Sequence, residues 1–156
     1  MSNYIPITER TFNFAVRITK LCIAIDRLVR THKLYFKGTG NREQGTEKCP
    51  NSFGDCYNYL DQQSGTPRLL ASQLFRSGTS IGANIEESQS AESGKDFISK
   101  QSIALKEARE TRYWLKLLIK AELIPEEKVS SILNECEELI KIIATSIVTK
   151  KKNLKN

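Results

Sequence analysis

The chain has 156 residues, of which 39% are hydrophobic and 27% charged, which suits one globular domain with one core and argues against global disorder. No apolar run approaches the roughly 18 residues that span a bilayer. The start, Met-Ser-Asn-Tyr, lacks the regions of a secretory signal, so we expect a cytoplasmic protein with no membrane partner. The net charge of +6 permits an acidic partner such as nucleic acid without requiring one.

The first segment with helical periodicity covers about residues 8–31. Its apolar residues recur at spacings of three and four, which places them on one helical face. That face contains Phe14, Ile18, Leu21, Cys22, Ile25, Leu28 and Val29. A second apolar set falls off this face, also at helical spacing, and consists of Phe12, Val16 and Ile23. The basic residues fall on the side away from the expected core, and they are Arg10, Arg17, Lys20, Arg27 and Arg30.

Residues 32–66 interrupt the periodicity, because glycines, a proline and many polar residues gather there. We expect a long loop, since bundle helices are usually joined by roughly 2–8 residues. Cys49 and Cys56 fall in this loop, where a disulfide and a zinc site are the alternatives to free thiols. Cytosolic thiols usually stay reduced, and zinc needs about four ligands in close pairs. With a single histidine, His32, and no CxxC, the sequence predicts no metal.

A second helix is expected over about residues 67–91, because proline is tolerated in a first turn, here as Pro67. One stripe of this helix is aliphatic and contains Leu70, Leu74, Ile81 and Ile85. Another consists of very small residues, Ala71, Gly78 and Gly82. Glycine inside a helix costs roughly 1 kcal/mol relative to alanine. The two glycines therefore either let another backbone approach closely or mark a kink or a frayed turn.

A third helix is expected over about residues 95–123, after a capping pattern of Ser93 and Asp96. Its inner face contains Phe97, Ala104, Ala108, Thr111, Leu115, Leu118 and Ile119. Charge divides the rest of its surface. Glu107 and Glu110 lie on one flank, and the other flank carries Arg109, Arg112, Lys116 and Lys120. Three large apolar residues fall off the core face, namely Tyr113, Trp114 and Leu117.

A fourth helix is expected over about residues 125–149, where Glu126 and Glu127 suit the helix N-terminus. Its core stripe contains Val129, Ile132, Leu133, Cys136, Leu139, Ile140, Ile143 and Ile147. The basic tail over residues 150–156 is expected to fray. Matched helix lengths, short second and third connections and one apolar stripe per helix predict a single all-α domain over residues 1–156, an antiparallel up-and-down four-helix bundle.

The charged and apolar surfaces each leave two interpretations open. The basic residues of the first and third helices either contact phosphates or form a solvated face. The off-core apolar residues either mark a protein interface, for which we favour self-association, or are covered by the long loop.

The sequence carries no enzymatic motif. It has no P-loop, Rossmann glycine pattern or GxSxG. A di-iron bundle needs Glu-x-x-His pairs, and His32 has no glutamate three residues before it. We therefore expect a protein that is not an enzyme and holds no cofactor. Zinc-finger, KH and RNP motifs are also missing, so base-specific readout is not expected.

The run RSGTSIGANIEE over residues 76–87 resembles a known signature. So do Ser90-Ala91-Glu92-Ser93, Asp96-Phe97-Ile98, the run KEARET over residues 106–111 and Tyr113-Trp114-Leu115. Together they resemble the bacterial S23, or 23S rRNA intervening-sequence, protein family, strongly over residues 69–123 and by pattern only in the first and last helices. In the signature we expect Gly78, Gly82 and Ala83 to allow close packing, and Asn84 and Glu86 to hydrogen-bond across a helix or subunit contact.

The resemblance implies an antiparallel four-helix bundle without catalytic residues. A related branch, the accessory variability protein of diversity-generating retroelements, is a basic pentamer that works with a reverse transcriptase and nucleic acid. We therefore expect a homo-oligomer, with the pentamer as its expected form, that binds RNA, DNA or a ribonucleoprotein through its basic faces. Its subunit contacts would use Phe12, Val16, Ile23, Gly78, Gly82, Asn84, Glu86, Tyr113 and Trp114. The alternative is a protein-only scaffold or adaptor.

Overall fold

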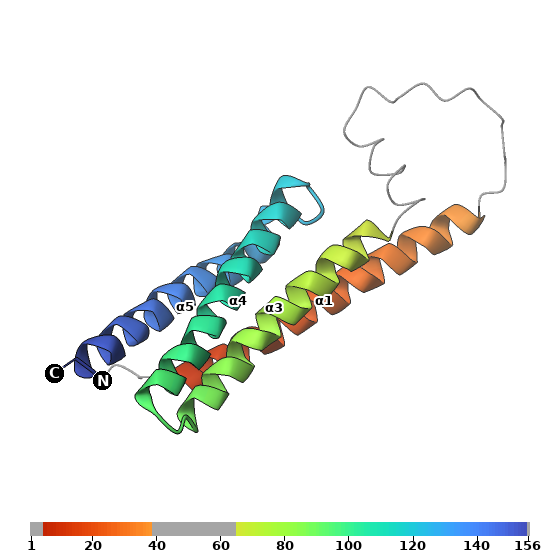
Figure 1. Ribbon diagram of the computed structural model, residues 1–156. Helices are drawn as coiled ribbons and strands as arrows, with labels where there is room; N and C mark the ends of the chain where they lie inside the picture. Colours follow the sequence, from red (N-terminus) through yellow and green to blue (C-terminus); the bar gives the residue numbers. More distant parts are fainter. Residues whose placement is uncertain (1–4, 39–64, 156) are drawn as a thin grey trace.

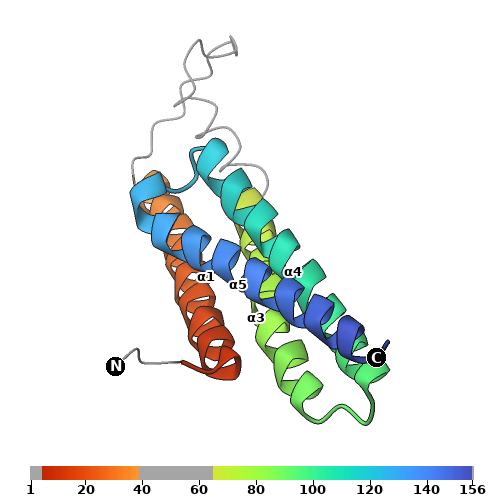
Figure 2. The ribbon, with the colours of Figure 1, turned by 90° about the vertical axis from the view of Figure 1, so that its left-hand side faces the viewer.

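The computed structural model describes residues 5–38 and 65–155 and shows four α-helices in those ranges. The helices are α1 (Ile7–Gly38), α3 (Thr66–Gln89), α4 (Gly94–Lys120) and α5 (Glu126–Asn153). They run alongside one another as an elongated bundle (Figures 1 and 2). The predicted all-α four-helix bundle is confirmed. Most of the predicted loop, residues 39–64, lies outside the described residues, and so do Cys49 and Cys56.

Two helices run further than the sequence predicted. α1 continues to Gly38 rather than ending near residue 31, because no proline or glycine precedes Gly38 in that stretch. α5 continues to Asn153 rather than fraying from residue 150. Its last turns are held against the start of α4. The ammonium of Lys150 lies 5.3 Å from the ring centre of Phe97, and a Cβ placed on Gly94 would lie 2.7 Å from Leu154 Cδ2.

Contacts between neighbouring helices establish the antiparallel order. Between α1 and α3, Arg68 pairs with Asp26 near one end, while Gly82 lies against Thr11 near the other. Between α3 and α4, Thr111 donates to the hydroxyl of Ser77 at 3.0 Å. Lys100 pairs with Glu87 further along the same two helices. α4 and α5 also pack closely, whereas α1 and α5 are in looser contact.

The core is formed by one stripe from each helix, as predicted. Its fully buried large side chains include Phe14, Ile18, Leu74, Ile81, Ile85, Leu115, Leu118, Leu139 and Ile143. Leu28 was predicted to belong to the core and is instead 55% exposed. It lines an open pocket with Lys128 in the first turn of α5. Leu28 therefore lies beside the first turn of α5, at an open edge of the bundle.

The two glycines of α3 allow α1 to approach closely. A Cβ on Gly78 would lie 2.8 Å from Ile18 Cγ2, and one on Gly82 would lie 3.4 Å from the carbonyl oxygen of Thr11. α3 is a continuous helix through both positions, so the alternative of a frayed turn is wrong. The small-residue stripe is therefore an intramolecular packing surface.

A polar layer lies inside the contact between α3 and α4. Ser77, Ser88, Gln101 and Thr111 are all buried. Gln101 Nε2 donates to Ser88 Oγ at 2.9 Å, and Ser88 donates in turn to the carbonyl of Ile85. Hydrogen bonding offsets the cost of burying these groups, except at Gln101 Oε1, which is buried and has no hydrogen-bond partner within the described residues. The hydrogen bonds between these residues fix the register of α3 against α4. Of the four residues, only Thr111 was expected from the sequence to face the interior.

The capping pattern before α4 is confirmed. The Ser93 hydroxyl accepts a hydrogen bond from the Asp96 amide at 3.1 Å. We expect Ser93→Ala to lower the free energy of unfolding by about 1 kcal/mol, because that amide loses its partner. Urea denaturation measures the change. Ser99→Ala, at an exposed position within the same helix, is the matched control, and an equal loss in both variants would contradict the capping role.

Candidate nucleic-acid interface

Part of the basic set on α1 holds α1 to α5. Arg10 Nη2 lies 2.7 Å from a carboxylate oxygen of Glu135 and 2.7 Å from one of Glu138. The hydrogen bond to Glu138, followed in size by the one to Glu135, raises the pKa of Arg10 above its ordinary value. Arg17 donates to the hydroxyl of Ser131 at 2.8 Å. The sequence suggested that both residues face phosphates, but the charge of Arg10 is compensated within the bundle and Arg17 is engaged with α5.

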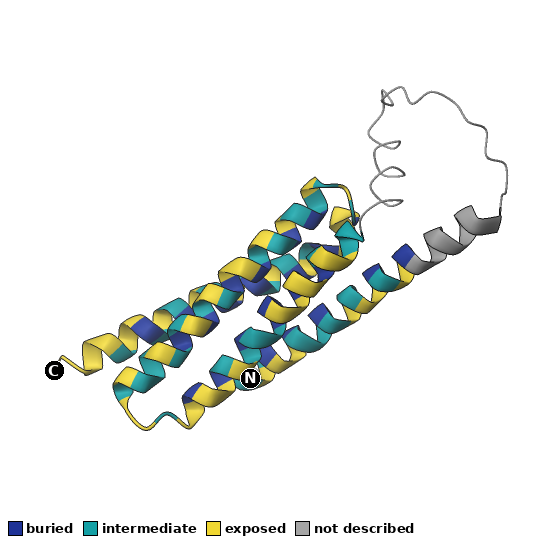
Figure 3. Ribbon diagram, turned by 45° about the vertical axis from the view of Figure 1, so that its right-hand side comes forward, coloured by how far each residue is buried: buried dark blue, intermediate teal, exposed yellow. Residues whose placement is uncertain are grey.

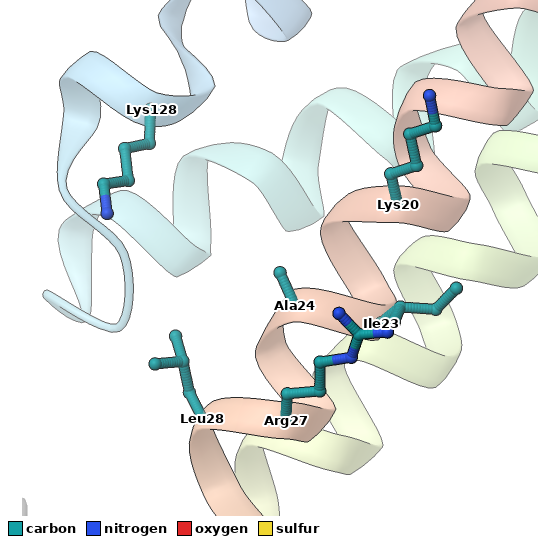
Figure 4. A pocket seen from close by; sticks show the side chains of 6 residues that line it. All are labelled: Lys20, Ile23, Ala24, Arg27, Leu28 and Lys128. Carbon is teal, nitrogen blue, oxygen red and sulfur yellow. The ribbon is translucent and has the colours of Figure 1, made fainter.

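Other basic residues of α1 surround an open pocket (Figure 4). Lys20 and Arg27 line it from α1, and Lys128 lines it from the first turn of α5. Its floor is apolar and contains Ile23, Ala24 and Leu28, and its volume is about 490 Å³. The side chain of Arg30 lies outside the described residues. Lys128 could not be assigned to this basic surface from the sequence, because only the fold brings the start of α5 beside α1.

We define the α4 basic stripe as Arg109, Arg112, Lys116 and Lys120. Three of these are exposed and Arg112 is half-buried. Lys116 Nζ lies 3.3 Å from a carboxylate oxygen of Glu137 on α5, which places the stripe at the border of the two helices. Within the described residues, Arg109, Arg112 and Lys120 form no ion pair.

One lysine of α5, Lys141, extends the basic surface formed by the α4 basic stripe. Lys141 is exposed and lies one helical turn beyond Glu137, so it projects from the same side of α5. Because α5 runs antiparallel to α4, Lys141 continues the basic surface toward the start of α4. The four-residue spacing of Glu137 and Lys141 can be read from the sequence. Their position next to the α4 basic stripe could be known only from the structure.

The carboxylates of α4 lie on its other flank. Trp114 Nε1 donates to Glu110 Oε1 at 3.0 Å. Burial and the neighbouring Glu110 raise the pKa of Glu107, and the positive charges of Lys106 and of Arg76 on α3 partly oppose that rise. Glu107 therefore faces the α3 side of α4, while the α4 basic stripe faces α5. Charge is divided across α4 as the sequence indicated.

The two adjacent aromatic residues in the last turns of α4, Tyr113 and Trp114, differ in exposure. Trp114 was predicted to lie off the core face, but it is half-buried and packs against the core. Tyr113 is 58% exposed. Their ring centres lie 4.9 Å apart with the ring planes at 72°, an edge-to-face contact. Trp114 therefore supports Tyr113 from the side of the core.

The off-core apolar residues of α1 lie on the side of the helix that faces away from the core. Exposed and buried positions alternate along α1 (Figure 3). Phe12 is 67% exposed and Ile23 47% exposed, while Val16 is half-buried. We call these three residues the α1 apolar stripe. Phe75 on the neighbouring α3 is also exposed. The alternative that residues 39–64 cover the stripe falls outside the described residues.

The signature residues of α3 act mainly within the chain. Gly78 and Gly82 pack against α1 of the same molecule. Asn84 Nδ2 donates to the carbonyl oxygen of Ser80 in its own helix at 2.8 Å, rather than across to another helix. Glu86 is exposed. Its predicted role in a subunit contact stays a prediction.

Reactive groups are scarce in the described part of the chain. Burial raises the pKa of Cys22 to about 11 and of Cys136 to about 12, so both thiols stay protonated at neutral pH. Residues 5–38 and 65–155 contain no group of three or more histidine, cysteine or acidic residues that could hold a metal ion. No described helix is long and apolar enough to cross a membrane.

Comparison with known proteins identifies the family. The sequence profile of the 23S rRNA-intervening sequence proteins matches residues 55–145, more than half of the chain. The protein belongs to the 23S rRNA-intervening sequence protein family. A crystal structure of an S23 ribosomal protein family member of unknown function from Bacteroides thetaiotaomicron is 34% identical to it. The alignment covers 91% of this chain and 98% of that one, with a TM-score of 0.61. No curated protein matches the chain significantly.

Membership in the 23S rRNA-intervening sequence protein family agrees with the all-α bundle and with the signature over residues 76–87. The described structural neighbour has no assigned function. The function of this family member must therefore be argued from its own surfaces, of which the α4 basic stripe and the α1 apolar stripe are the two most distinctive.

Proposed function

We propose that the protein is a non-enzymatic homo-oligomer that binds nucleic acid or a ribonucleoprotein through the α4 basic stripe. The observation that carries the proposal is the arrangement of charge on α4. Cations gather on the flank next to α5, and the carboxylates of Glu107 and Glu110 lie on the opposite flank. Lys106 of α4 and Arg76 of α3 lie near Glu107, so that flank carries both signs, whereas the flank next to α5 carries only cations of α4.

The cations of the α4 basic stripe are better placed to contact a phosphate backbone than to pair with carboxylates of the bundle. Its cations recur at spacings of three and four, so they form one row along the helix. Only Lys116 has an ion pair within the described residues. Such a row releases counterions from nucleic acid when it binds, which gives affinity that falls with salt and has little sequence preference.

Self-association is supported by the α1 apolar stripe. Phe12, Val16 and Ile23, with Thr19 between them, follow the alternating four-three-four spacing of a coiled-coil seam. No described helix of the same chain covers Phe12 or Ile23. Exposed apolar surface of this kind marks a protein interface. The α1 apolar stripe lies on a different helix from the α4 basic stripe. An oligomer can therefore use the α1 apolar stripe for assembly and the α4 basic stripe for nucleic acid.

The charge assignment is tested by two triple variants that each lower the net charge from +6 to +3. Arg109→Gln/Arg112→Gln/Lys120→Gln removes three cations of the stripe and keeps the Lys116–Glu137 pair. Lys20→Gln/Arg27→Gln/Lys128→Gln removes the cations around the pocket. We expect the first variant to reduce the salt slope of nucleic-acid binding by about 3 and the second to change it little. Fluorescence anisotropy across a salt series measures both.

Two results would contradict this assignment. Equal losses in the two variants would show that only total charge matters. Unchanged binding in the stripe variant would exclude the stripe as the contact surface. Failure of the wild-type protein to bind any nucleic acid at low salt would instead favour the protein-only scaffold, for which the α1 apolar stripe is the supporting feature.

A further inference from the structure

An exposed aromatic ring lies within the α4 basic stripe. Tyr113 follows Arg109 by four residues and precedes Lys116 by three, so both cations flank it on the helix surface. Tyr113 is 58% exposed. One carboxylate, that of Glu110, lies three residues before it on the other side and accepts a hydrogen bond from Trp114, while Glu137 of α5 is paired with Lys116.

The Tyr113 ring is also held in place. Trp114 meets it edge to face, a contact that uses at most one face of the tyrosine ring. Trp114 itself is fixed by its hydrogen bond to Glu110 and by packing against the core. An aromatic ring that is 58% exposed therefore lies beside the cations of the stripe, with part of its surface open to solvent.

From this arrangement we propose that Tyr113 is a stacking platform for an unpaired base, and that the ligand of the α4 basic stripe is single-stranded nucleic acid. The inference rests on the proposed function and specifies its substrate class. A base stacks on the open face of Tyr113, while Arg109 and Lys116 contact the phosphates on either side. Aromatic rings interleaved with cations are the usual means of binding single strands without sequence preference.

A duplex does not satisfy the same site. Its bases are stacked on one another and paired, so it presents phosphates to the cations and leaves the tyrosine face without a partner. A second copy of the chain fits less well, because docking the stripe on α1 of a neighbouring molecule would bring its cations toward Lys20 and Arg27. Like charges in contact oppose such an interface.

The chain offers a direct optical test, because Trp114 is its only tryptophan and touches Tyr113. The full-length protein is titrated with an oligothymidine strand and with a duplex of equal length, while tryptophan fluorescence and anisotropy are recorded. Tyr113→Phe keeps the ring, and Tyr113→Leu removes it and keeps apolar bulk. Both changes fall at an exposed position, and thermal unfolding checks that the bundle is unchanged.

We expect the single strand to quench Trp114 and to bind more tightly than the duplex. Tyr113→Phe should retain its affinity within about twofold, and Tyr113→Leu should lose about 5- to 150-fold for the single strand only. Equal single-strand affinity of wild type and Tyr113→Leu would overturn stacking, while loss of binding in the stripe variant would leave the proposed function standing. Dissociation of an oligomer by Tyr113→Leu would assign the ring to a subunit contact and also overturn the inference.

Discussion

Replacing Gly78 with valine is expected to destabilise the bundle by about 3 kcal/mol, the upper part of the range for overpacked cores. A Cβ at this position would lie 2.8 Å from Ile18 Cγ2, 3.0 Å from Cγ1 and 3.2 Å from Cβ, so the whole side chain of Ile18 must move. Ile18 is completely buried and has nowhere to go without separating α1 from α3. Since small domains are stable by about 5–15 kcal/mol, such a loss is readily measured by urea denaturation.

Gly82→Ala is the matched control on the same helix. A Cβ there would lie 3.4 Å from the Thr11 carbonyl oxygen, close to ordinary van der Waals contact. Alanine has a helix propensity about 1 kcal/mol better than that of glycine, so this change should be neutral or slightly stabilising. In the Gly78→Val background, Ile18→Ala should cost less than it does alone, because the clashing atoms are removed. Additive effects would contradict the contact.

Adding charge to the α1 apolar stripe is expected to dissociate the oligomer. Phe12→Glu/Ile23→Glu places two carboxylates on exposed positions, so the fold should persist while an apolar subunit contact should not. Light scattering should show a wild-type mass that is a multiple of the 17.7 kDa chain, fivefold for a pentamer, and a double variant at the mass of one chain.

The control for this experiment keeps the same change in charge. Asn13→Glu/Lys20→Gln also lowers the net charge by two, at exposed positions of α1 outside the stripe. It should leave the mass unchanged. A wild-type protein at the mass of one chain would exclude self-association, and an oligomer that survives Phe12→Glu/Ile23→Glu would exclude the α1 apolar stripe as its contact.

The features that the sequence predicted correctly are those that depend on one helix at a time. Periodicity placed Phe14 and Ile18 in the core, and the cost of glycine in a helix pointed to the close approach at Gly78. The Ser93 cap followed from a local pattern. Each of these signals is contained within a few turns of chain.

The features that it missed depend on which helix lies opposite. Arg10 faces outward from the core on a helical wheel, but Glu135 and Glu138 of α5 reach it there. Leu28 has core periodicity, but it lines an open pocket beside the first turn of α5 and is exposed. Tyr113 and Trp114 were treated as one apolar patch, yet half-burial and a hydrogen bond to Glu110 separate Trp114 from its exposed neighbour.

The proposed interface shows the same division. The row of cations on α4 was visible from spacing alone, whereas its continuation by Lys141 required the position of α5. The aromatic ring among the cations gained meaning only when its exposure and its contact with Trp114 were known. The cations of the candidate site could therefore be predicted from the sequence, and the proposed ligand class could not.

The most direct test of the account is the affinity of the wild-type protein for a labelled single strand, measured by anisotropy at increasing salt on a sample of known mass. We predict micromolar or tighter binding at low salt and a linear fall of log affinity with log salt concentration. Absence of binding at low salt, or binding that does not respond to salt, would contradict it.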